Sequence, residues 1–507
     1  MNDDLPEGWA TAKIADCTIR VGSGATPRGG SESYKELGIP LIRSQNVHLD
    51  GFRDEGLVYL DDAQADALKE VTVKAGDVLL NITGASIGRV TQAPERMQGA
   101  RVNQHVCIIR PAIVVDSGYL ARYLGSPVVQ KIVMTEEYGV TRQALTKGQI
   151  LDFDIPIAPA AEQTRIVAKV ETLLAHVNAV LQRLAKVPAI LKRFRQSVLA
   201  AACSGRLTTD WRELNAVDSA GVALARIKQA SGIVKTRRDV PEGVEPPEAV
   251  ATLEMPSTWA LVSVAEMLRS RTLIDVKDGN HGANHPKVTD FTSEGLPFIT
   301  AAQVNHFRVD YATAYKVSGA PLQKLRVGFA KPGDAILTHK GSVGRSALNS
   351  LPCVLTPQTT YYRCNEQVVI SQYLVYYFAS VQFFGQLASV MSQTTRDFVP
   401  ISEQYRLFLV LPPLAEQHEI VRRVEALFRL ADAIDKRVAA ATARAEKLTQ
   451  AILAKAFRGE LVPTEAELAR REGREYEPAS VLLERIRVKA TTSAEERAPR
   501  RRAKKIR

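Results

Sequence analysis

The chain has 507 residues, of which 45% are hydrophobic, so it can bury several cores and two to four domains are expected. No run of about 18 apolar residues occurs, and the N-terminus, MNDDLPEGW, lacks the basic and apolar regions of a signal peptide. We therefore expect a soluble, cytoplasmic protein without membrane contact. The net charge of +11 argues only weakly for a nucleic-acid partner, because residues 497–507 (RAPRRRAKKIR) carry seven basic groups and leave +4 for the rest.

Five cysteines, at positions 17, 107, 203, 353 and 364, are scattered and form no C-x-x-C pair. An odd number of cysteines without paired spacing predicts neither a disulfide framework nor a zinc cluster. We therefore expect no metal centre built on cysteine.

Residues 1–158 are predicted to form a mixed α/β domain of short apolar strands, glycine turns and occasional helices. Strands are expected over 39–43, 77–82 and 106–110, and a helix over 119–133.

The strand at 77–82 runs into a glycine-rich turn within GDVLLNITGASIGRV (76–90). A nucleotide-binding P-loop needs the spacing G-x-x-x-x-G-K-[ST], because its Lys reaches the terminal phosphates. Here Gly84 and Gly88 lead to Arg89, so nucleotide binding is not expected and the stretch is interpreted as a strand followed by a turn.

Residues 159–205 change to a helical period and predict a long coiled-coil helix. Pro188 lies inside the pattern and predicts a kink, since proline removes a backbone donor. Gly205 is a helix stop, and a charged, proline-containing linker is expected over 206–253. The ten apolar positions, spaced by four and three, are Ile166, Val170, Leu173, Val177, Val180, Leu184, Val187, Leu191, Phe194 and Val198.

From residue 254 the chain repeats itself. LPEGW (5–9) recurs as MPSTW (255–259), and the glycine turn recurs as GDAILTHKGSVGRSA (333–347). The repeat predicts an α/β domain over 254–411, with strands at 297–300, 334–338 and 360–363 and a helix at 371–390. A coiled-coil helix over 412–459 follows, and then a tail (460–507) with a short helix and the basic C-terminus. The second apolar seam is Ile420, Val424, Leu427, Ala431, Ile434, Val438, Ala441, Ala445, Leu448 and Ile452.

The expected fold is therefore mixed α/β, with two duplicated α/β domains separated by two long helices. Two heptad helices at equivalent places in a duplicated chain most simply pack on each other. A pseudo-twofold axis perpendicular to them would make the pair an antiparallel coiled coil.

No catalytic motif stands out. The Pro-Pro pairs in EPPEA (245–249) and LPPLA (411–415) do not match the Asn/Asp-Pro-Pro-aromatic loop of amino-methyltransferases. Asp278, His281 and His285 suggest a metal site, but the glycines between them predict a loop, so we favour a polar, base-contacting role. We expect a non-catalytic chain without a metal of its own.

The doubled architecture resembles the specificity subunit of Type I restriction–modification enzymes. The resemblance covers residues 1 to about 460. It is carried by PAAEQTRIVAKVETL (159–173) and PLAEQHEIVRRVEAL (413–427), which open the two helices, and by the two glycine loops. NQHVCIIRP (103–111), TPQTTYYRC (356–364) and DGNHGANHPK (278–287) are also similar to stretches of that family's target recognition domains.

The resemblance implies two target recognition domains, each of which reads one half of a split, asymmetric site in double-stranded DNA. Two modification subunits would dock on the helices, which set the spacer, and methylate adenine N6. Restriction subunits would add ATP-driven translocation and cleavage. S-adenosylmethionine, ATP and Mg would be bound by these partner subunits, and no cofactor by this chain.

DNA contacts are expected from polar side chains at strand ends, because Arg and Lys suit guanine and Asn and Gln suit adenine. Arg89 and Arg345 stand beside the glycine turns, whose backbone N–H groups can approach phosphate. Alternatively, each Gly-Arg pair is a turn with a solvated Arg, and Gln104 and Gln358 are buried and satisfy backbone groups. The remaining candidates are Ser44, Gln45, Asn46, Asn103, His105, Thr141 and Arg142 in the first domain, and Asn280, His281, Gln303, Asn305, His339, Lys340, Thr359, Thr395 and Arg396 in the second.

Glu162-Gln163 and Glu416-Gln417 begin the two long helices, where a Glu side chain is favoured by the positive end of the helix dipole. The resemblance adds contact with a modification subunit as a second possibility. A different class of function also stays open: a coiled-coil scaffold with two adaptor domains that binds only protein.

Overall fold

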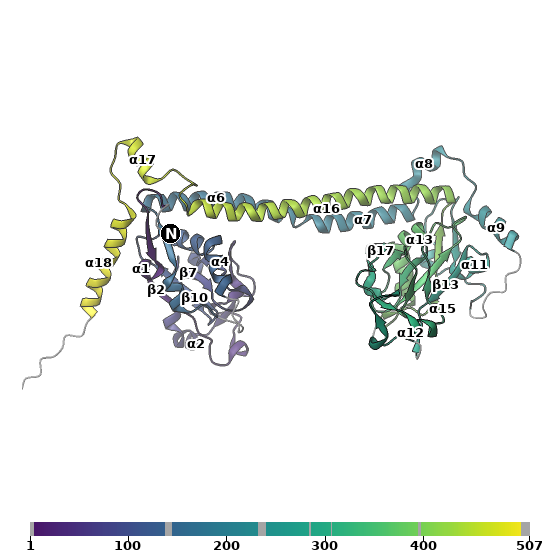
Figure 1. Cartoon of the computed structure of the whole chain (residues 1–507), viewed down its shortest axis with the longest axis horizontal. Coiled ribbons are helices and arrows are strands. Elements are labelled where there is room, and N and C mark those ends of the chain that lie inside the picture. Colours follow the sequence, from purple (N-terminus) through teal and green to yellow (C-terminus); the bar gives the residue numbers. More distant parts are fainter. Residues whose placement is uncertain are drawn as a thin grey trace, which may run out of the picture. The chain divides into compact units, whose positions relative to one another are not determined.

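A computed structural model describes residues 5–136, 144–231, 240–282, 285–305, 307–393 and 397–497. The chain forms two compact units (Figure 1): unit 1 comprises Met1–Ala185 and Ala439–Arg507, and unit 2 comprises Lys186–Val438. Each unit contains one of the predicted α/β domains together with parts of the predicted long helices. Within the described ranges, no helix is both long and apolar enough to cross a lipid bilayer.

The α/β domain of unit 1 is built from short strands. They are β1 (Ala10–Lys13), β2 (Thr18–Ser23), β3 (Ile39–Ile42), β4 (Val47–His48), β5 (Gly51–Phe52), β6 (Val58–Leu60), β7 (Val78–Asn81), β8 (Val90–Gln92), β9 (Arg101–Val102), β10 (Val106–Pro111) and β11 (Asp154–Ile157). The main sheet is antiparallel with the order β2-β10-β7-β8, and Ile108 of β10 lies opposite Gly22 and Leu79. Smaller sheets have the orders β6-β3-β9, β1-β11 and β4-β5. The strands predicted at 39–43, 77–82 and 106–110 are confirmed.

The helices of this domain are short. They are α1 (Ile14–Cys17), α2 (Asp62–Ala67), α3 (Ser117–Leu124), α4 (Pro127–Glu136) and α5 (Lys147–Asp152). The single helix predicted over 119–133 is wrong, because the chain breaks between α3 and α4. Pro127 lacks the N–H that would continue α3, and it begins α4 instead.

Unit 2 repeats this plan with more strands. They are β12 (Ala260–Ser263), β13 (Leu273–Asp278), β14 (Phe291–Thr292), β15 (Leu296–Ile299), β16 (Val304–Asn305), β17 (Phe307–Val309), β18 (Tyr315–Val317), β19 (Phe329–Ala330), β20 (Ala335–Thr338), β21 (Ser346–Leu348), β22 (Cys353–Leu355), β23 (Thr359–Cys364), β24 (Ser392–Gln393), β25 (Asp397–Phe398) and β26 (Phe408–Leu411). The two large sheets have the orders β13-β23-β20-β21-β17-β16 and β14-β18-β15-β22-β19. The strands predicted at 297–300, 334–338 and 360–363 are confirmed.

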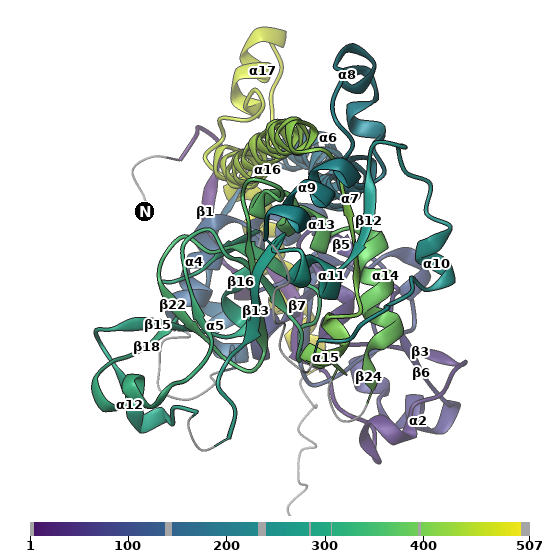
Figure 2. The ribbon, with the colours of Figure 1, turned by 90° about the vertical axis from the view of Figure 1, so that its right-hand side faces the viewer.

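The helices of unit 2 include three in the segment that the sequence predicted as a linker. They are α7 (Val187–Cys203), α8 (Thr209–Leu214), α9 (Ala220–Ser231), α10 (Glu248–Ala251), α11 (Val264–Arg269), α12 (Gly319–Lys324), α13 (Ser371–Phe378), α14 (Val381–Val390) and α15 (Ile401–Gln404). The single helix predicted over 371–390 is wrong, since Ser380 ends it and its hydroxyl caps α14 by accepting from the N–H of Phe383 at 3.2 Å. The sheet β14-β18-β15-β22-β19 and helix α12 lie on the opposite side of unit 2 from α8 (Figure 2).

Helices α6 (Ala160–Leu184) and α7 provide one partner of the coiled coil, and α16 (Leu414–Ala456) provides the other. In unit 1, α6 lies beside the C-terminal half of α16; in unit 2, α7 lies beside its N-terminal half (Figure 1). Arg195 of α7 pairs with Asp432 and Asp435 at 2.8 and 2.7 Å, whereas Leu207, further along the chain, accepts from Arg423. Residue numbers rise along one helix as they fall along the other, so the pairing is antiparallel, as predicted.

The buried seam departs from the predicted heptads in two ways. The break at 185–186 precedes Pro188, which lies in the first turn of α7 and not inside a continuous helix. Val180 and Leu448, predicted to lie in the seam, are 47% and 51% exposed. A helix with 3.6 residues per turn drifts away from a strict seven-residue repeat, which moves burial to neighbours such as Leu174 and Leu453.

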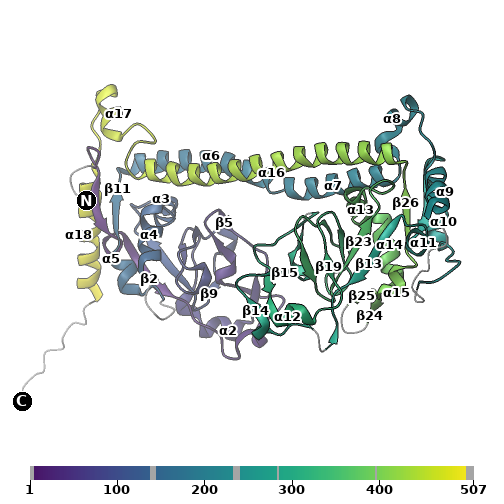
Figure 3. The same cartoon turned by 45° about the vertical axis from the view of Figure 1, so that its right-hand side comes forward.

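The tail of the chain belongs to unit 1, where α17 (Glu465–Glu472) and α18 (Ala479–Arg497) follow α16. Helix α18 lies beside β1 and α1 (Figure 3). The N–H of Ala479 donates to the carbonyl of Gly8 at 2.8 Å, and Leu483 is buried in the core of the domain. The predicted tail is therefore a packed part of unit 1 up to this helix.

Candidate nucleic-acid interface

In unit 1, segments that are far apart in the sequence meet at one edge of the sheets. Strands β2 and β7 both run antiparallel to β10, so their C-terminal ends lie beside its start. Strand β3 pairs in parallel with β9, and the N–H of Asn103 donates to the carbonyl of Ile42 at 3.0 Å. We call residues 24–26, 43–46, 82–89 and 103–105 the strand-end edge of unit 1.

A chain of hydrogen-bonded side chains crosses this edge. The hydroxyl of Thr26 donates to Oε1 of Gln104, and Nε2 of Gln104 donates to Nε2 of His105 at 2.9 Å. Nδ1 of His105 contacts the hydroxyl of Thr83 at 2.5 Å. Gln104 itself is exposed, so its amide is held at the surface from both sides.

Unit 2 has an equivalent edge, formed by residues 279–281, 300–305, 339–345 and 356–359. Strands β13 and β20 flank β23, and β15 pairs in parallel with β22. The N–H of Ala301 donates to Oε1 of Gln358 at 3.2 Å, and Arg345 donates to Oδ1 of Asn305 at 3.0 Å. Predicted residues again come together at one end of the sheet.

Two glycines show that the two edges share one scaffold. A Cβ on Gly24 would lie 1.9 Å from the carbonyl oxygen of Val102, and a Cβ on Gly279 would lie 2.1 Å from that of Leu355. Both positions exclude any side chain because the neighbouring strand passes so closely. This match aligns Thr26 with His281, two residues further along.

The side chains at matched positions of the edges differ. Thr26 bonds to Gln104, whereas His281 forms a 2.7 Å contact with Asp278. Lys340 lies over the ring of Phe398 at 5.3 Å. The two edges therefore present different polar groups on one backbone plan.

The glycine turns use their own backbone N–H groups internally. The N–H of Gly88 donates to Asn81 at 2.8 Å, and that of Gly344 donates to Thr338 at 2.9 Å. The N–H of Arg345 donates to the hydroxyl of Thr338 at 2.9 Å. These three N–H groups are therefore engaged within the protein, contact of the other turn N–H groups with phosphate stays a prediction, and the side chains of Arg89 and Arg345 are the cations beside the turns.

Five predicted contact residues are enclosed within their domains. Asn46 is 0% exposed, and its amide binds the carbonyls of Arg53 and Glu55 and the N–H of Arg43. Asn280, 3% exposed, binds residues 326 and 327 in the same way. Such side chains satisfy buried backbone groups, as the alternative interpretation of the buried amides expects. The five are Asn46, Asn103, Asn280, His339 and Thr359.

His339 is the titratable member of this group. Its Nδ1 contacts the carbonyl of Val399 at 3.0 Å, and burial lowers the pKa of the imidazole. The ring is completely enclosed and supports the turn that carries Lys340.

The other predicted contact residues that the structure describes are partly or fully exposed. Gln45 is exposed and donates to the carbonyl of Gly56 at 2.9 Å. Ser44 accepts a bond from Asn81 through its carbonyl, and Oε1 of Gln303 accepts from the hydroxyl of Thr300. Thr141, Arg142, Thr395 and Arg396 lie outside the described residues.

The Glu-Gln pairs at the helix starts are enclosed in both units. Trp9 donates its indole N–H to Oε1 of Glu162 at 2.9 Å, and Trp259 donates to Oε2 of Glu416 at 2.8 Å. Gln163 accepts from the N–H of Asp116 at 2.9 Å. Gln417 likewise accepts from the N–H of Ile370 at 2.8 Å. These residues therefore fasten each α/β domain to its long helix.

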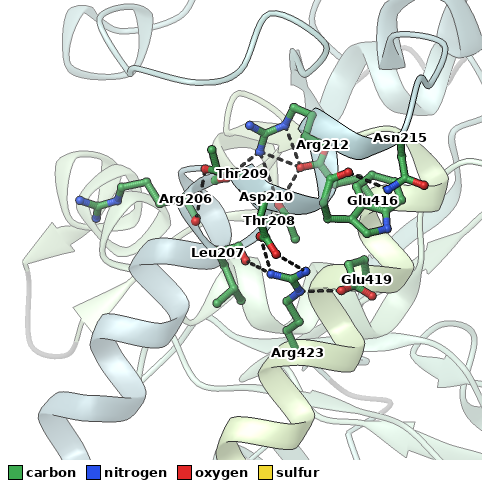
Figure 4. Close-up of polar contacts among 12 residues, drawn as sticks. Arg206, Leu207, Thr208, Thr209, Asp210, Arg212, Asn215, Glu416, Glu419 and Arg423 are labelled. Atoms are coloured by element: carbon green, nitrogen blue, oxygen red, sulfur yellow. Dashed lines mark hydrogen bonds and ion pairs between the residues drawn. The ribbon is translucent and has the colours of Figure 1, made fainter.

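In unit 2, the contact between the α/β domain and the start of α16 includes an ion-pair network (Figure 4). Arg212 and Thr208 point toward the Glu416 carboxylate and donate to it at 2.8 and 2.7 Å. Arg423 points toward Asp210 and Glu419. In unit 1 the corresponding bond is made by the N–H of Glu465, which donates to Glu162 at 2.8 Å.

Known proteins include relatives that are similar to this chain over almost its whole length. A family model described as "Type I restriction modification DNA specificity domain" matches residues 6–188. The chain is 26% identical to the Type I restriction enzyme EcoKI specificity subunit of Escherichia coli (strain K12), over 98% of this chain and 99% of that protein. It is 29% identical to the EcoBI specificity subunit of Escherichia coli, over 79% and 78%. The chain belongs to the specificity subunits of Type I restriction–modification enzymes.

Solved structures have the same fold as this specificity subunit. A chain from a structure described as "Structural basis underlying complex assembly and conformational transition of the type I R-M system" is similar with a TM-score of 0.63 at 19% identity, covering 90% of this chain and all of that one. The HsdS subunit from Thermoanaerobacter tengcongensis is similar with a TM-score of 0.50 at 18% identity, covering 90% and 99%.

Several residues of this specificity subunit were missed by the sequence reasoning. Trp9 and Trp259 stand in the repeated LPEGW and MPSTW, so their recurrence was a signal for a shared structural role. Thr26 and Thr83 carry no comparable signal, because only the fold brings them to Gln104 and His105. Among the described residues, no group of three or more His, Cys, Asp or Glu side chains could hold a metal ion.

Proposed function

We propose that this chain is the sequence-specific DNA-binding subunit of a Type I restriction–modification complex. Each α/β domain reads one half of a split, asymmetric site in double-stranded DNA. The observation that carries the proposal is the pair of strand-end edges, which gather exposed polar side chains from distant segments on one shared scaffold. Amides and cations at a surface edge are the groups that recognise base edges and phosphates.

The differences between the edges support different half-sites. His281 replaces Thr26 and Lys340 stands in the turn of unit 2, whereas Gln104 and Gln358 recur. A basic group beside the amide changes the pattern of donors that faces a groove. One chain would therefore recognise two half-sites of different sequence.

The helices are proposed to dock two modification subunits and to set the spacer between the half-sites. Exposed apolar side chains on the helices support a docking role: Val180 and Leu448 in unit 1 and Ile190 and Leu430 in unit 2 are between 47% and 60% exposed. Apolar side chains held at a helix surface favour a protein partner over water. Glu162, Gln163, Glu416 and Gln417 are enclosed and take no part in this surface.

The chain is proposed to be non-catalytic, because the methyltransferase loop is missing from its sequence. S-adenosylmethionine would be bound by the modification subunits, and ATP and Mg by restriction subunits. The basic run at 497–507 would add non-specific attraction to DNA phosphate.

The test uses the purified chain alone and the chain with its modification subunits. Alone, it is expected to neither methylate nor cut DNA; with its partners, it should direct adenine methylation to one bipartite motif. DNA affinity should show a sequence preference and fall with salt. A protein-only scaffold would show no such preference, and methylation by the chain after rigorous removal of partners would contradict the non-catalytic role.

A further inference from the structure

Gln104 stands out because its amide is both exposed and held in one orientation. It belongs to the turn between β9 and β10, and Thr26 and His105 bind it from opposite sides. The side chain is long and flexible, so an exposed glutamine normally loses rotamer freedom when it binds a ligand. Two neighbours that fix the amide beforehand reduce that loss.

In the structure, the amide nitrogen of Gln104 faces His105 and its amide oxygen faces Thr26. Nε2 of His105 accepts from Gln104, so the imidazole proton is on Nδ1, which faces the hydroxyl of Thr83. The hydroxyl of Thr26 donates to Oε1 of Gln104. The sequence Thr26–Gln104–His105–Thr83 is therefore a directed chain of donors and acceptors.

An amide in this chain keeps half of its bonding capacity. Of its two N–H groups one is used by His105, and of its two oxygen lone pairs one is used by Thr26. One donor and one acceptor remain side by side. Adenine presents the complementary pair in the major groove, since N7 accepts and the N6 amino group donates.

The matched glutamine of unit 2 has different neighbours. Oε1 of Gln358 accepts from the backbone N–H of Ala301, and His281 occupies the position of Thr26. The directed chain of side chains is therefore a feature of unit 1. Gln358 serves as the natural control for any change made at Gln104.

We propose that Gln104 reads an adenine in the half-site of unit 1, and that Thr26 and His105 act as positioning residues for its amide. This inference rests on the proposed function. The adenine concerned stays stacked in the duplex, because a base taken out for methylation turns its edge to the methyltransferase. The half-site read by unit 1 must therefore contain an A·T pair in addition to the methylated adenine.

The experiment compares the motif methylated by the complete complex with modification subunits for Gln104→Ala and for Gln358→Ala. Single-molecule sequencing of the methylated DNA gives both motifs. Gln104→Ala should relax one A·T position in one half-site, lowering discrimination there by about 5- to 150-fold in methylation rate on matched duplexes. Gln358→Ala should leave that half-site unchanged. Gln104→Glu, which loses its donor, should no longer prefer adenine.

Thr26 tests the positioning role separately. Thr26→Val removes the hydroxyl and should weaken discrimination at the same A·T position, whereas Thr26→Ser keeps it and should restore it. These two variants also decide the matter if Gln104→Ala abolishes methylation. Unchanged discrimination in Thr26→Val would then contradict the inference.

The outcomes separate this inference from the proposed function. If the unaltered complex methylates no bipartite motif, the proposed function fails. If it methylates one and Gln104→Ala leaves both half-sites intact, or relaxes a G·C position, the proposed function stands and the role of Gln104 is wrong. Relaxation of the same half-site by Gln358→Ala would also contradict it.

Discussion

Trp9 donates its indole N–H to Glu162 across 2.9 Å, and this bond joins the start of an α/β domain to the first turn of its long helix. Trp259 and Glu416 make the same bond in unit 2 at 2.8 Å. Both carboxylates are completely enclosed, at helix starts where the dipole favours negative charge. The third partner differs, because Arg212 binds Glu416 whereas a backbone N–H binds Glu162.

Burial raises the pKa of Glu162 above its ordinary value. A carboxyl with a raised pKa contributes stability that is fully present below its unfolded pKa, about 4.3, and is lost as pH rises through the folded pKa. Glu162→Gln removes this titration. The free energy of unfolding of the variant, relative to the unaltered chain, should therefore rise between about pH 4.3 and neutrality.

Calorimetric melting of both chains across this pH range measures the difference. Gln163→Glu is no suitable comparison because it adds a charge, so Arg226→Ala, at an exposed pair with Asp218, serves as the control. The free energy of unfolding of Glu162→Gln is compared with that of the unaltered chain at each pH. If this difference stays constant or decreases as the pH rises, the raised pKa is contradicted.

Arg212 is the cation of the enclosed network in unit 2. Arg212→Ala leaves the buried carboxylate of Glu416 without its ion pair, and breaking a buried pair costs about 3 kcal/mol of unfolding free energy. Arg226→Ala, at the exposed pair, should cost less than about 1 kcal/mol. Urea denaturation followed by tryptophan fluorescence checks both values, because Trp259 lies in the network. Equal effects of the two variants would show that the enclosed network adds no more stability than an exposed ion pair.

Local patterns predicted much of the fold. Short apolar runs placed the strands at 77–82 and 106–110, and heptads placed the long helices. The predicted seam was wrong at Val180, because the heptad pattern does not reveal how the buried face of a helix shifts along its partner.

The candidate site was predictable only in part. Gln104 and Arg345 were found because polar residues at strand ends converge when the strands pair. Asn46 has the same character in the sequence but is enclosed, since its amide satisfies three backbone groups of its own loop. The bond between Glu162 and the N–H of Glu465 joins residues 303 positions apart, and no local pattern encodes such a contact.

Helix length is predicted to set the unread gap between the half-sites. Four residues inserted after Gln182 in α6, together with four after Val438 in α16, lengthen each helix by about 6 Å, just over one turn. Since B-DNA rises about 3.4 Å per base pair, the methylated motif should gain a gap one or two pairs longer with the same half-site letters. The single insertion after Gln182 is the control and should shift the gap less. An active double variant with an unchanged gap would contradict the prediction that helix length sets the spacer.

Separate readout by the two domains is the central claim, and exchange of one domain tests it most directly. Residues 1–157 are replaced by the recognition domain of another specificity subunit, and the methylated motif of the complex with modification subunits is read by single-molecule sequencing. We predict that one half of the motif changes and the other half keeps every letter. A motif in which both halves change, or neither, would contradict the account.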